Sequence, residues 1–170
     1  MYKYIIKNNL NTFNFHDAYI KQMKQKNNDM IWIVDALNIK KECPLNKYSE
    51  DMQIDNVQII FKNSTINYIK DSQNNEEVLL NKEEINNIIN YFPFSQILSF
   101  EEYTKDENNR YTANFLNATN KGIYTINISF DKVDVCFNQF SHAAYYTGEK
   151  YREIIIQNID KLHKRNHFEL

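Results

Sequence analysis

The chain has 170 residues, 42% of them hydrophobic, which is enough to bury one core, and its net charge is only −2. Two glycines and two prolines argue against a glycine-rich phosphate loop, and the weak net charge argues against nucleic-acid binding. No stretch approaches the roughly 18 apolar residues of a membrane span, and the N-terminus lacks a signal-like apolar run. We therefore expect one domain, residues 1–170, in the cytoplasm, and the abundance of asparagine, isoleucine and lysine suggests a bacterial source.

The first third of the chain predicts short strands. Residues 2–6 form a candidate strand. Residues 18–26 and 29–37 form a candidate hairpin around Asn27 and Asn28, because asparagine tolerates the left-handed turn conformation. The second arm of that hairpin is almost entirely apolar, as in a central strand that is buried on both faces.

The middle of the chain predicts a second hairpin and a helix. Residues 57–61 and 65–70 are the two arms of the hairpin. In "NKEEINNIINYF", Asn81 can cap a helix and Glu84 follows three residues later, which is close to the capping-box pattern. The isoleucines of this stretch form one apolar stripe at helical spacing, so we expect a helix over about residues 82–92.

The last third of the chain alternates between apolar and polar residues. Residues 96–104 and 110–117 predict a hairpin, and residues 122–130 predict a strand with one apolar and one polar face. An apolar stripe over about residues 149–165 predicts a second helix. Sequential hairpins with few helices predict an α+β fold, in which both helices pack on an antiparallel sheet, and a β-sandwich with an attached helix is the alternative.

The stretch "NFHDAYI" carries a candidate acid–base pair, His16 and Asp17. A carboxylate can orient a histidine that acts as a general base. In an extended strand, however, adjacent side chains point to opposite faces, so the pair converges only if these residues form a turn. The structural interpretation is a turn that leads into strand 18–26, with Phe13 and Phe15 packed inward.

A second candidate, His142, follows a predicted strand and is adjacent to Ser141. This pair has no acidic neighbour and no glycine-flanked serine motif, which disfavours a serine nucleophile. The nearby Tyr145, Tyr146 and Tyr151 favour binding instead, because tyrosine offers a large rigid surface with a polar tip. The packing alternative is that these tyrosines fill the corner between the sheet and the second helix.

The sequence predicts no metal site and no cofactor. Cys43 and Cys136 are far apart and belong to no Cys-x-x-Cys pair, which disfavours zinc and leaves a disulfide open. His163 and His167 have the spacing of a metal-binding pair on a helix. The cations between them and the absence of a third ligand disfavour a metal there.

Charge is distributed unevenly along the chain. Residues 1–48 sum to +4, residues 49–109 to −8 and residues 110–170 to +2. The acidic middle third forms a negative face if the fold gathers its residues, and the alternative is a solvated surface without a binding role. The polar, irregular stretch 38–55 contributes three candidate binding residues without a calcium-loop pattern. They are Glu50, Asp51 and Asp55.

Two patches, "NFHDAYI" before a hairpin and "FNQFSHAAYY" late in the chain, resemble small bacterial proteins of mixed α/β type that are grouped with toxin-immunity proteins. The resemblance implies a non-enzymatic protein that binds one partner protein, and it transfers no site residue. With this resemblance, the acidic middle third favours a basic partner, because complementary fields speed and orient association. The sequence therefore predicts a partner-binding module. The alternative is a small hydrolase or ligand-binding protein in which His16, Asp17 and His142 share a pocket. The oligomeric state is not predicted.

Overall fold

The computed structural model of the protein describes residues 2–72, 78–105 and 109–144. Strands hold 58% of this part of the chain, which makes the fold largely all-β. The strands are β1 (Tyr4–Lys7), β2 (Phe13–Asn14), β3 (Tyr19–Lys26), β4 (Asp29–Asp35), β5 (Leu37–Ile39), β6 (Met52–Ile54), β7 (Val57–Lys62), β8 (Thr65–Asp71), β9 (Val78–Leu79), β10 (Ser95–Lys105), β11 (Tyr111–Thr119), β12 (Gly122–Phe130), β13 (Lys132–Phe137) and β14 (His142–Ala143). The helical elements are the 3₁₀ turns η1 (Leu10–Thr12) and η3 (Ile89–Tyr91) and the α-helix α1 (Lys82–Ile88).

The expected α+β architecture is therefore wrong. The described residues contain one short α-helix, α1, instead of two helices packed on the sheet. The second predicted helix, about residues 149–165, lies outside the described residues. The physical reason for the error is that a long, bent sheet can cover its own apolar face, so the strands need fewer helices than the pattern suggested.

The first predicted helix is present but shorter than expected. The Asn81 side chain accepts hydrogen bonds from the backbone N–H groups of Glu83 at 2.9 Å and Glu84 at 3.1 Å. The Glu84 carboxylate in turn accepts from the Asn81 N–H at 2.7 Å, which completes the predicted capping box. After Ile88 the chain continues as η3, and Phe92 then enters the core fully buried.

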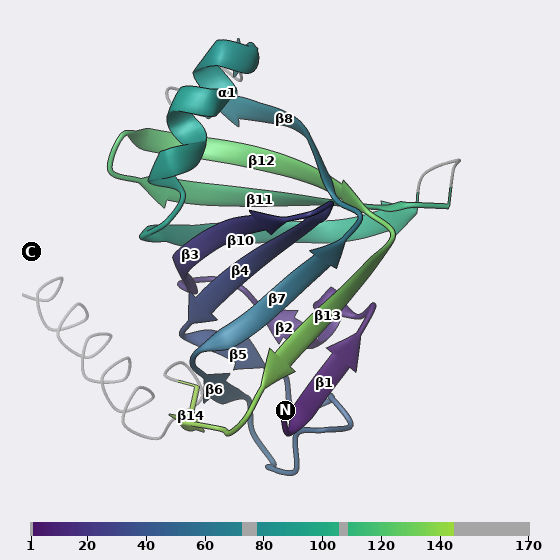
Figure 1. Ribbon diagram of the computed structural model, residues 1–170. Coiled ribbons are helices and arrows are strands. Elements are labelled where there is room, and N and C mark those ends of the chain that lie inside the picture. Colours follow the sequence, from purple (N-terminus) through teal and green to yellow (C-terminus); the bar gives the residue numbers. More distant parts are fainter. Residues whose placement is uncertain (1, 73–77, 106–108, 145–170) are drawn as a thin grey trace, which may run out of the picture.

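Ten strands form one antiparallel sheet in the order β1-β13-β7-β4-β3-β10-β11-β12-β8-β9. The sheet bends, so that β10, β11, β12 and β8 form one layer and β3, β4, β7, β13 and β1 cross it as another (Figure 1). A second sheet has four strands in the order β14-β6-β5-β2. It starts where β4 ends, because only Ala36 separates β4 from β5.

Two segments of the chain cross from one layer to the other. β7 pairs with β4 and β13, whereas β8 pairs with β12 and β9, so the hairpin predicted for residues 57–61 and 65–70 is wrong. In the same way β12 pairs within the first layer and β13 within the second. Strands that change layers at a bend are characteristic of orthogonally packed sheets. The predicted hairpins β3-β4 and β10-β11 are confirmed, with Asn27 in the left-handed conformation at φ 56°.

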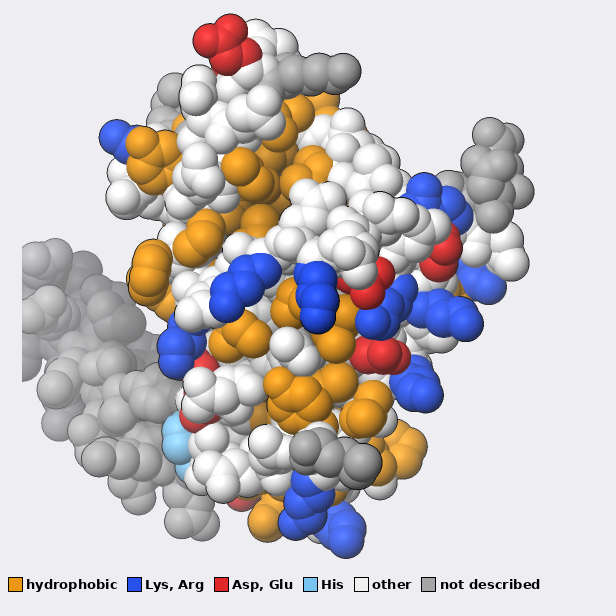
Figure 2. Space-filling model, viewed as in Figure 1, with side chains coloured by type: hydrophobic (Ala, Val, Ile, Leu, Met, Phe, Trp, Pro, Cys, Tyr) orange, Lys and Arg blue, Asp and Glu red, His pale blue; other side chains and the backbone are white. Residues whose placement is uncertain are grey.

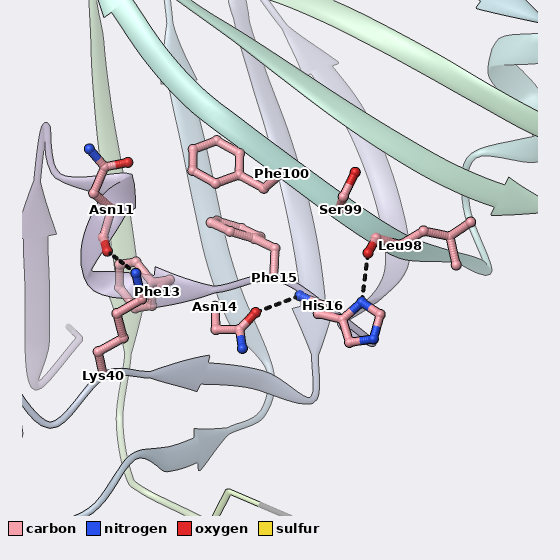
Figure 3. Close-up of a pocket in the computed structure, with 9 residues that line it drawn as sticks. All are labelled: Asn11, Phe13, Asn14, Phe15, His16, Lys40, Leu98, Ser99 and Phe100. Carbon is pink, nitrogen blue, oxygen red and sulfur yellow. Dashed lines mark hydrogen bonds between the residues drawn. The ribbon is translucent and has the colours of Figure 1, made fainter. Parts of the chain in front are cut away.

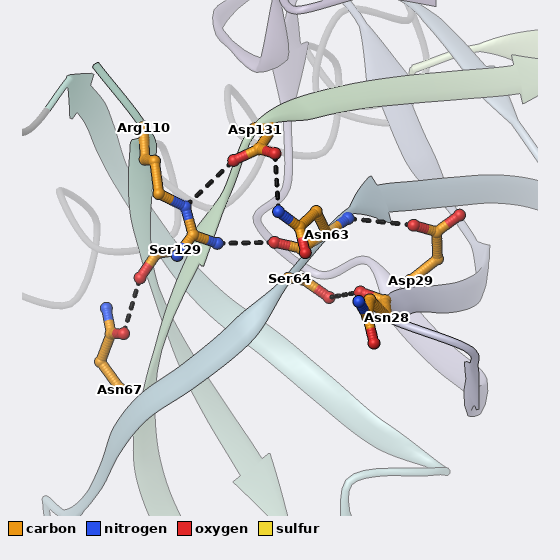
Figure 4. Close-up of polar contacts among 8 residues, drawn as sticks. All are labelled: Asn28, Asp29, Asn63, Ser64, Asn67, Arg110, Ser129 and Asp131. Atoms are coloured by element: carbon orange, nitrogen blue, oxygen red, sulfur yellow. Dashed lines mark hydrogen bonds and ion pairs between the residues drawn. The ribbon is translucent and has the colours of Figure 1, made fainter. Parts of the chain in front are cut away.

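A cluster of polar side chains holds the bend where both crossings occur (Figure 4). Arg110 donates from Nη2 to the Asn63 carbonyl at 2.6 Å and from Nε to the Asp131 carboxylate at 3.1 Å. The Asn63 side-chain amide donates to Asp131 at 2.8 Å, and the Asn63 N–H donates to Asp29 at 3.0 Å. Asn63 also adopts a left-handed backbone with φ 49°, so the β7–β8 crossing is fixed by local conformation and by contacts.

The two layers meet over aromatic side chains. Between ring centroids, Phe115 of β11 lies 4.9 Å from Trp32 of β4 and 6.1 Å from Phe61 of β7. All three side chains are fully buried. Edge-to-face ring pairs of this kind add about 0.5–1.5 kcal/mol each beyond the burial of apolar area. The core is therefore formed by side chains of both layers that pack against each other.

Cys43 and Cys136 are both buried free thiols, so the disulfide that the sequence left open does not form. Burial raises the pKa of the Cys136 thiol, and the nearby Asp134 carboxylate raises it further. No helix in the described part of the chain is long and apolar enough to cross a membrane.

Candidate functional site

A cavity opens where β10 separates from the chain that precedes β3. Ile97 of β10 accepts a backbone hydrogen bond from Asp17 at 3.0 Å and donates one to Ala18 at 2.8 Å. The next residue, Leu98, has no partner in the β10–β11 register, which shifts between Ile97 and Ser99. A β-bulge of this kind bends its strand and disturbs the pairing, and here it borders the cavity.

The cavity has a volume of about 700 Å³ and draws its lining from segments that are far apart in the sequence. Buried aromatic side chains lie beneath it: Phe13 and Phe15 are 2% and 1% exposed, and the Phe15 ring centroid lies 4.8 Å from that of Phe100. The inward packing predicted for Phe13 and Phe15 is thus confirmed. Polar groups form the rim (Figure 3). The lining residues are Asn11, Phe13, Asn14, Phe15, His16, Lys40, Leu98, Ser99 and Phe100.

His16 and Asp17 lie in a turn at one end of this cavity, as the structural interpretation of the sequence required. Asp17 has a left-handed backbone with φ 67°, and this brings its Oδ2 to 3.6 Å from the Nε2 of His16. The other ring nitrogen, Nδ1, lies 2.6 Å from the Leu98 carbonyl oxygen. A carbonyl can only accept, so Nδ1 carries a proton, and Nε2 is the atom that faces the Asp17 carboxylate.

Lys40 lies at the other end of the cavity (Figure 3). Its Nζ donates to the Asn11 carbonyl at 2.8 Å, and its backbone N–H donates to the Thr12 carbonyl at 2.9 Å. Both contacts join the end of β5 to η1 and hold the ammonium group beside the cavity. An ammonium group has three protons, so two stay available to a ligand.

His142 does not share a site with His16. It lies in β14, whereas the chain reaches His16 directly after β2, and these strands are opposite edges of the four-stranded sheet. Neighbouring strands are about 4.8 Å apart, so the three steps from β14 to β2 place the two strands roughly 14 Å from each other. A hydrolase that uses both histidines is therefore inconsistent with the structure.

The candidate binding residues Glu50, Asp51 and Asp55 stabilise the chain around β6. The Glu50 carbonyl accepts from a side-chain amide, and Asp51 accepts from the Lys41 N–H at 2.8 Å. Asp55 accepts from the backbone of Ala36 and from two side chains. The Asp51 and Asp55 carboxylates and the Glu50 backbone carbonyl thus hold the fold around β6.

Asp55 is the most strongly engaged of these acids. It accepts from the Ala36 N–H at 2.8 Å, the Gln53 amide at 3.2 Å and the Ser141 hydroxyl at 2.6 Å. Partial burial raises the pKa of Asp55, but these hydrogen bonds and the nearby His142 lower it by more, so it lies below its ordinary value. The carboxylate thus joins the turn after β4 to the segment before β14.

Other candidates from the sequence fall outside the described residues. These are Tyr145, Tyr146, Tyr151, His163 and His167. Among residues 2–72, 78–105 and 109–144, no three His, Cys, Asp or Glu side chains are grouped as metal ligands. In the same ranges, the ring nitrogens of His16 and His142 contact backbone carbonyls and the Asp17 carboxylate.

A second candidate site is the outer side of β3, β4, β7, β13 and β1, which we call the five-strand face. Residues paired across an antiparallel sheet share a face, so the registers define rows of side chains. One row consists of Lys24, Ile31, Ile60, Asp134 and Lys7. The next row consists of Gln22, Ile33, Gln58, Cys136 and Ile5. The third consists of Lys26, Asp29, Lys62 and Lys132.

The five-strand face is apolar at its centre and positive at its rim (Figure 2). Ile31, Ile33 and Ile60 are half-buried, and Ile5 is 45% exposed. The three rows contain five lysines and two aspartates, which gives a net charge of +3. One of these lysines, Lys62, forms an ion pair with Asp29 at 2.9 Å.

The outer side of the other layer has a different character. The Ser129 hydroxyl donates to Asn67, and the Asn67 amide donates to Asn127, both at 2.6 Å. The chain of hydrogen bonds continues from Asn127 to Asn114 at 2.6 Å and ends on the Glu101 carboxylate at 2.9 Å. Asn127 and Ser129 lie on the face of residues 122–130 that was predicted to be polar, and they are only 8% and 6% exposed. The polar side chains of this surface therefore form hydrogen bonds with one another.

Comparison with known proteins gives no relative from which a function could be transferred. No protein-family model, curated protein or solved structure matches the chain. The resemblance to toxin-immunity proteins therefore stays a prediction. Within residues 2–72, 78–105 and 109–144, the five-strand face and the cavity are the candidate functional surfaces.

Proposed function

We propose that the protein is a non-enzymatic module that binds a partner protein through its five-strand face. The observation that carries the proposal is the row of isoleucines on the solvent side of β4 and β7. In an antiparallel sheet with one face on the core, the other face is usually polar. A contiguous apolar centre surrounded by charged residues is instead typical of protein–protein interfaces.

The charge of this face specifies the partner further. A net charge of +3 around an apolar centre favours a partner whose own apolar patch is surrounded by Asp and Glu. This is opposite to the basic partner that the sequence favoured. The described acidic residues of the middle third do not gather on one face. Glu84 caps α1, Glu101 of β10 accepts a hydrogen bond from Asn114 of β11, and Asp55 lies beside β6.

The role fits an inhibitor of the toxin-immunity kind, which acts by occupying a partner and needs no catalytic group. The lack of a metal-ligand cluster among the described residues is compatible with this role. The continuous pairing of β3, β4, β7, β13 and β1 supports it as well, because a surface built on paired strands loses little conformational entropy when it docks.

The proposal can be tested with matched lysine substitutions on the two outer faces. Ile31→Lys places a charge at the centre of the five-strand face, and Leu116→Lys places the same charge on the half-buried outer side of β11. Wild-type and variant proteins are used to capture partners from lysates of the source cells, and the affinity of a purified partner is then measured by calorimetry. We expect Ile31→Lys to weaken binding at least about tenfold, the loss of roughly 1.4 kcal/mol at an interface centre.

Two results would contradict the proposal. One is an unchanged affinity of Ile31→Lys together with a loss in Leu116→Lys. The other is an association rate that does not fall when Lys24→Glu reverses a charge at the rim, since rim charges mainly set association rates. Circular dichroism spectra of all variants serve as the folding control.

A further inference from the structure

We propose that two copies of the chain form a symmetric dimer through an exposed aromatic corner. The corner consists of Tyr19 of β3, Tyr91 of η3 and Phe94, which lies in the turn directly before β10. Hydrophobic side chains are visible on the surface between the five-strand face and α1 (Figure 2). The corner shares no residue with the three rows of the five-strand face, so the inference is independent of the proposed function.

The first argument is the backbone conformation of Phe94. The Ser95 N–H donates to the Phe92 carbonyl at 3.0 Å, so these two residues are the ends of a tight turn. Proline fixes a negative φ at Pro93, and Phe94 has φ 70°, which together define a type II turn. The position of Phe94 in such a turn usually holds glycine, because a side chain crowds the backbone there. A bulky residue in this conformation is strained.

The second argument is the exposure of the same side chain. Phe94 is 73% exposed, whereas Phe92, on the other side of Pro93, is fully buried. The Phe94 N–H donates to the Ile20 carbonyl of β3 at 2.5 Å, which fixes the backbone of the turn. The ring therefore gains little from burial in the monomer, although its position strains the backbone. Strain that the monomer does not offset indicates a contact that Phe94 makes in another state.

Two further aromatic side chains extend this surface. Tyr19 is 43% exposed and is the register partner of Gln96, two residues after Phe94. Tyr91 is 36% exposed and precedes Phe94 by three residues. In the described part of the chain, the corner thus holds three of the six large hydrophobic side chains that are exposed. Aromatic residues are enriched at protein–protein interfaces, so this concentration favours docking of a protein surface.

Charged side chains of both signs lie next to the corner. Lys21 forms an ion pair at 3.0 Å with Asp35, which is a register partner of Tyr19. The Nζ of Lys121 lies 5.1 Å from the centroid of the Tyr91 ring. The fourth charge belongs to Asp17, which accepts a hydrogen bond at 2.6 Å from the side chain of Gln96. Two positive and two negative charges give a sum of zero.

This charge balance favours a second copy of the chain as the partner. In a twofold-symmetric dimer each patch meets a copy of itself, so any net charge of the patch is repelled by the same charge across the interface. The five-strand face, with its net charge of +3, is unsuited to such a contact. At the aromatic corner, the cations of one copy can instead face the anions of the other, and Phe94 can pack against the aromatic side chains of its partner.

The test is sedimentation equilibrium of the full chain from about 5 to about 500 μM, with a dimer dissociation constant expected within that range. Phe94→Ala should weaken the dimer at least about tenfold, because it removes the central aromatic side chain. Tyr48→Ala is the matched control, since Tyr48 is an aromatic residue outside the corner that is 51% exposed. We expect this control to change the dissociation constant less than about twofold.

A second comparison tests the strain separately from dimerisation. Phe94→Ala keeps a Cβ atom in the left-handed conformation, whereas Phe94→Gly removes it. Both variants should lose the dimer. At a concentration at which both are monomeric, Phe94→Gly should melt about 2–3 °C above Phe94→Ala, because glycine adopts this conformation without strain.

A third comparison tests the charges. Lys21→Glu gives the corner a net charge of −2 and should weaken the dimer at least about threefold. Lys26→Glu makes the same change at the far end of β3 and should leave the dissociation constant within about twofold. Ile31→Lys, at the centre of the five-strand face, should also leave the dimer intact.

Four results would overturn the inference. They are a monomer throughout the concentration range, an unchanged dimer in Phe94→Ala, a loss in Ile31→Lys or Tyr48→Ala equal to that in Phe94→Ala, and a Phe94→Gly variant that melts no higher than Phe94→Ala. Loss of the dimer in Phe94→Ala and Lys21→Glu, with retention in Tyr48→Ala and Lys26→Glu, supports it.

Discussion

Replacing Phe115 by alanine tests whether the contact between the layers is the main source of stability. Phe115 is fully buried and extends from β11 towards the opposite layer. Its ring centroid lies 4.9 Å from Trp32, 5.1 Å from Phe100, 5.4 Å from Phe15 and 6.1 Å from Phe61. Its removal would leave a cavity bounded by both layers, and the surrounding backbone cannot close it without moving one layer.

The expected loss follows from these contacts. Core Phe→Ala substitutions cost about 3–5 kcal/mol, and four ring contacts place Phe115 in the upper part of that range, at about 4–5 kcal/mol. The entropy of unfolding is about 2.1 cal/mol/K per residue, or roughly 0.36 kcal/mol/K for this chain. The melting temperature should therefore fall by about 12 °C.

The assay is urea unfolding followed by the fluorescence of Trp32, the single tryptophan of the chain, with circular dichroism as a second probe. The control is Leu116→Ala, because Leu116 is the next residue of β11 and faces the outer side, where it is only half-buried. We expect this control to lose about 1 kcal/mol. A loss below about 1.5 kcal/mol for Phe115→Ala, or one equal to that of the control, would refute the assignment of Phe115 as the bridge.

Two further predictions concern titratable groups. The pKa of Asp55 is lower in the folded protein than its ordinary value of 3.8, so its stabilising effect is complete above about pH 4 and is lost as the pH falls through the folded-state pKa. At neutral pH, Asp55→Asn should therefore lower the free energy of unfolding in urea by about 1–3 kcal/mol. Between pH 5 and pH 2, the stability of this variant should fall less than that of the wild type, because it lacks the one linked proton. An unchanged pH dependence would contradict this. The pKa of Cys136 is raised by burial, and Cys43 is buried too. A thiol reagent at about pH 8 should consequently react with neither in the folded protein and with both in urea, and fast labelling of the native protein would contradict the burial.

The parts of the fold that the sequence predicted are those set by local chemistry. The capping box at Asn81 depends on residues within one turn, and the left-handed Asn27 in the β3–β4 hairpin depends on a single residue type. The pairing partners of β7 and β8 depend on contacts far along the chain. Both strands alternate as in a hairpin, but the left-handed Asn63 and its contacts send them into different layers, and alternation carries no information about this.

The cavity could be predicted only in part. His16 attracted attention as half of an acid–base pair, whereas the structure gives it a place at the rim of a cavity, with Nδ1 fixed by the Leu98 carbonyl. Lys40 and Ser99 gave no signal, because a lysine at a strand end and a serine within a strand are common everywhere. What joins them is the bulge at Leu98, and a bulge leaves no dependable trace in a sequence that alternates on both sides of it.

The apolar composition of β4 links the sequence most directly to the proposed function. "DMIWIVDAL" predicted a strand buried on both faces, and the inner residues Trp32 and Val34 are indeed fully buried. On the outer face, Ile31 and Ile33 are only half-buried. Isoleucine on a solvent-facing strand does not improve folding as much as it would in the core, since its burial there is incomplete. The gain from these residues is larger when a second apolar surface covers them, and the lysines at the rim give that second surface a preferred charge.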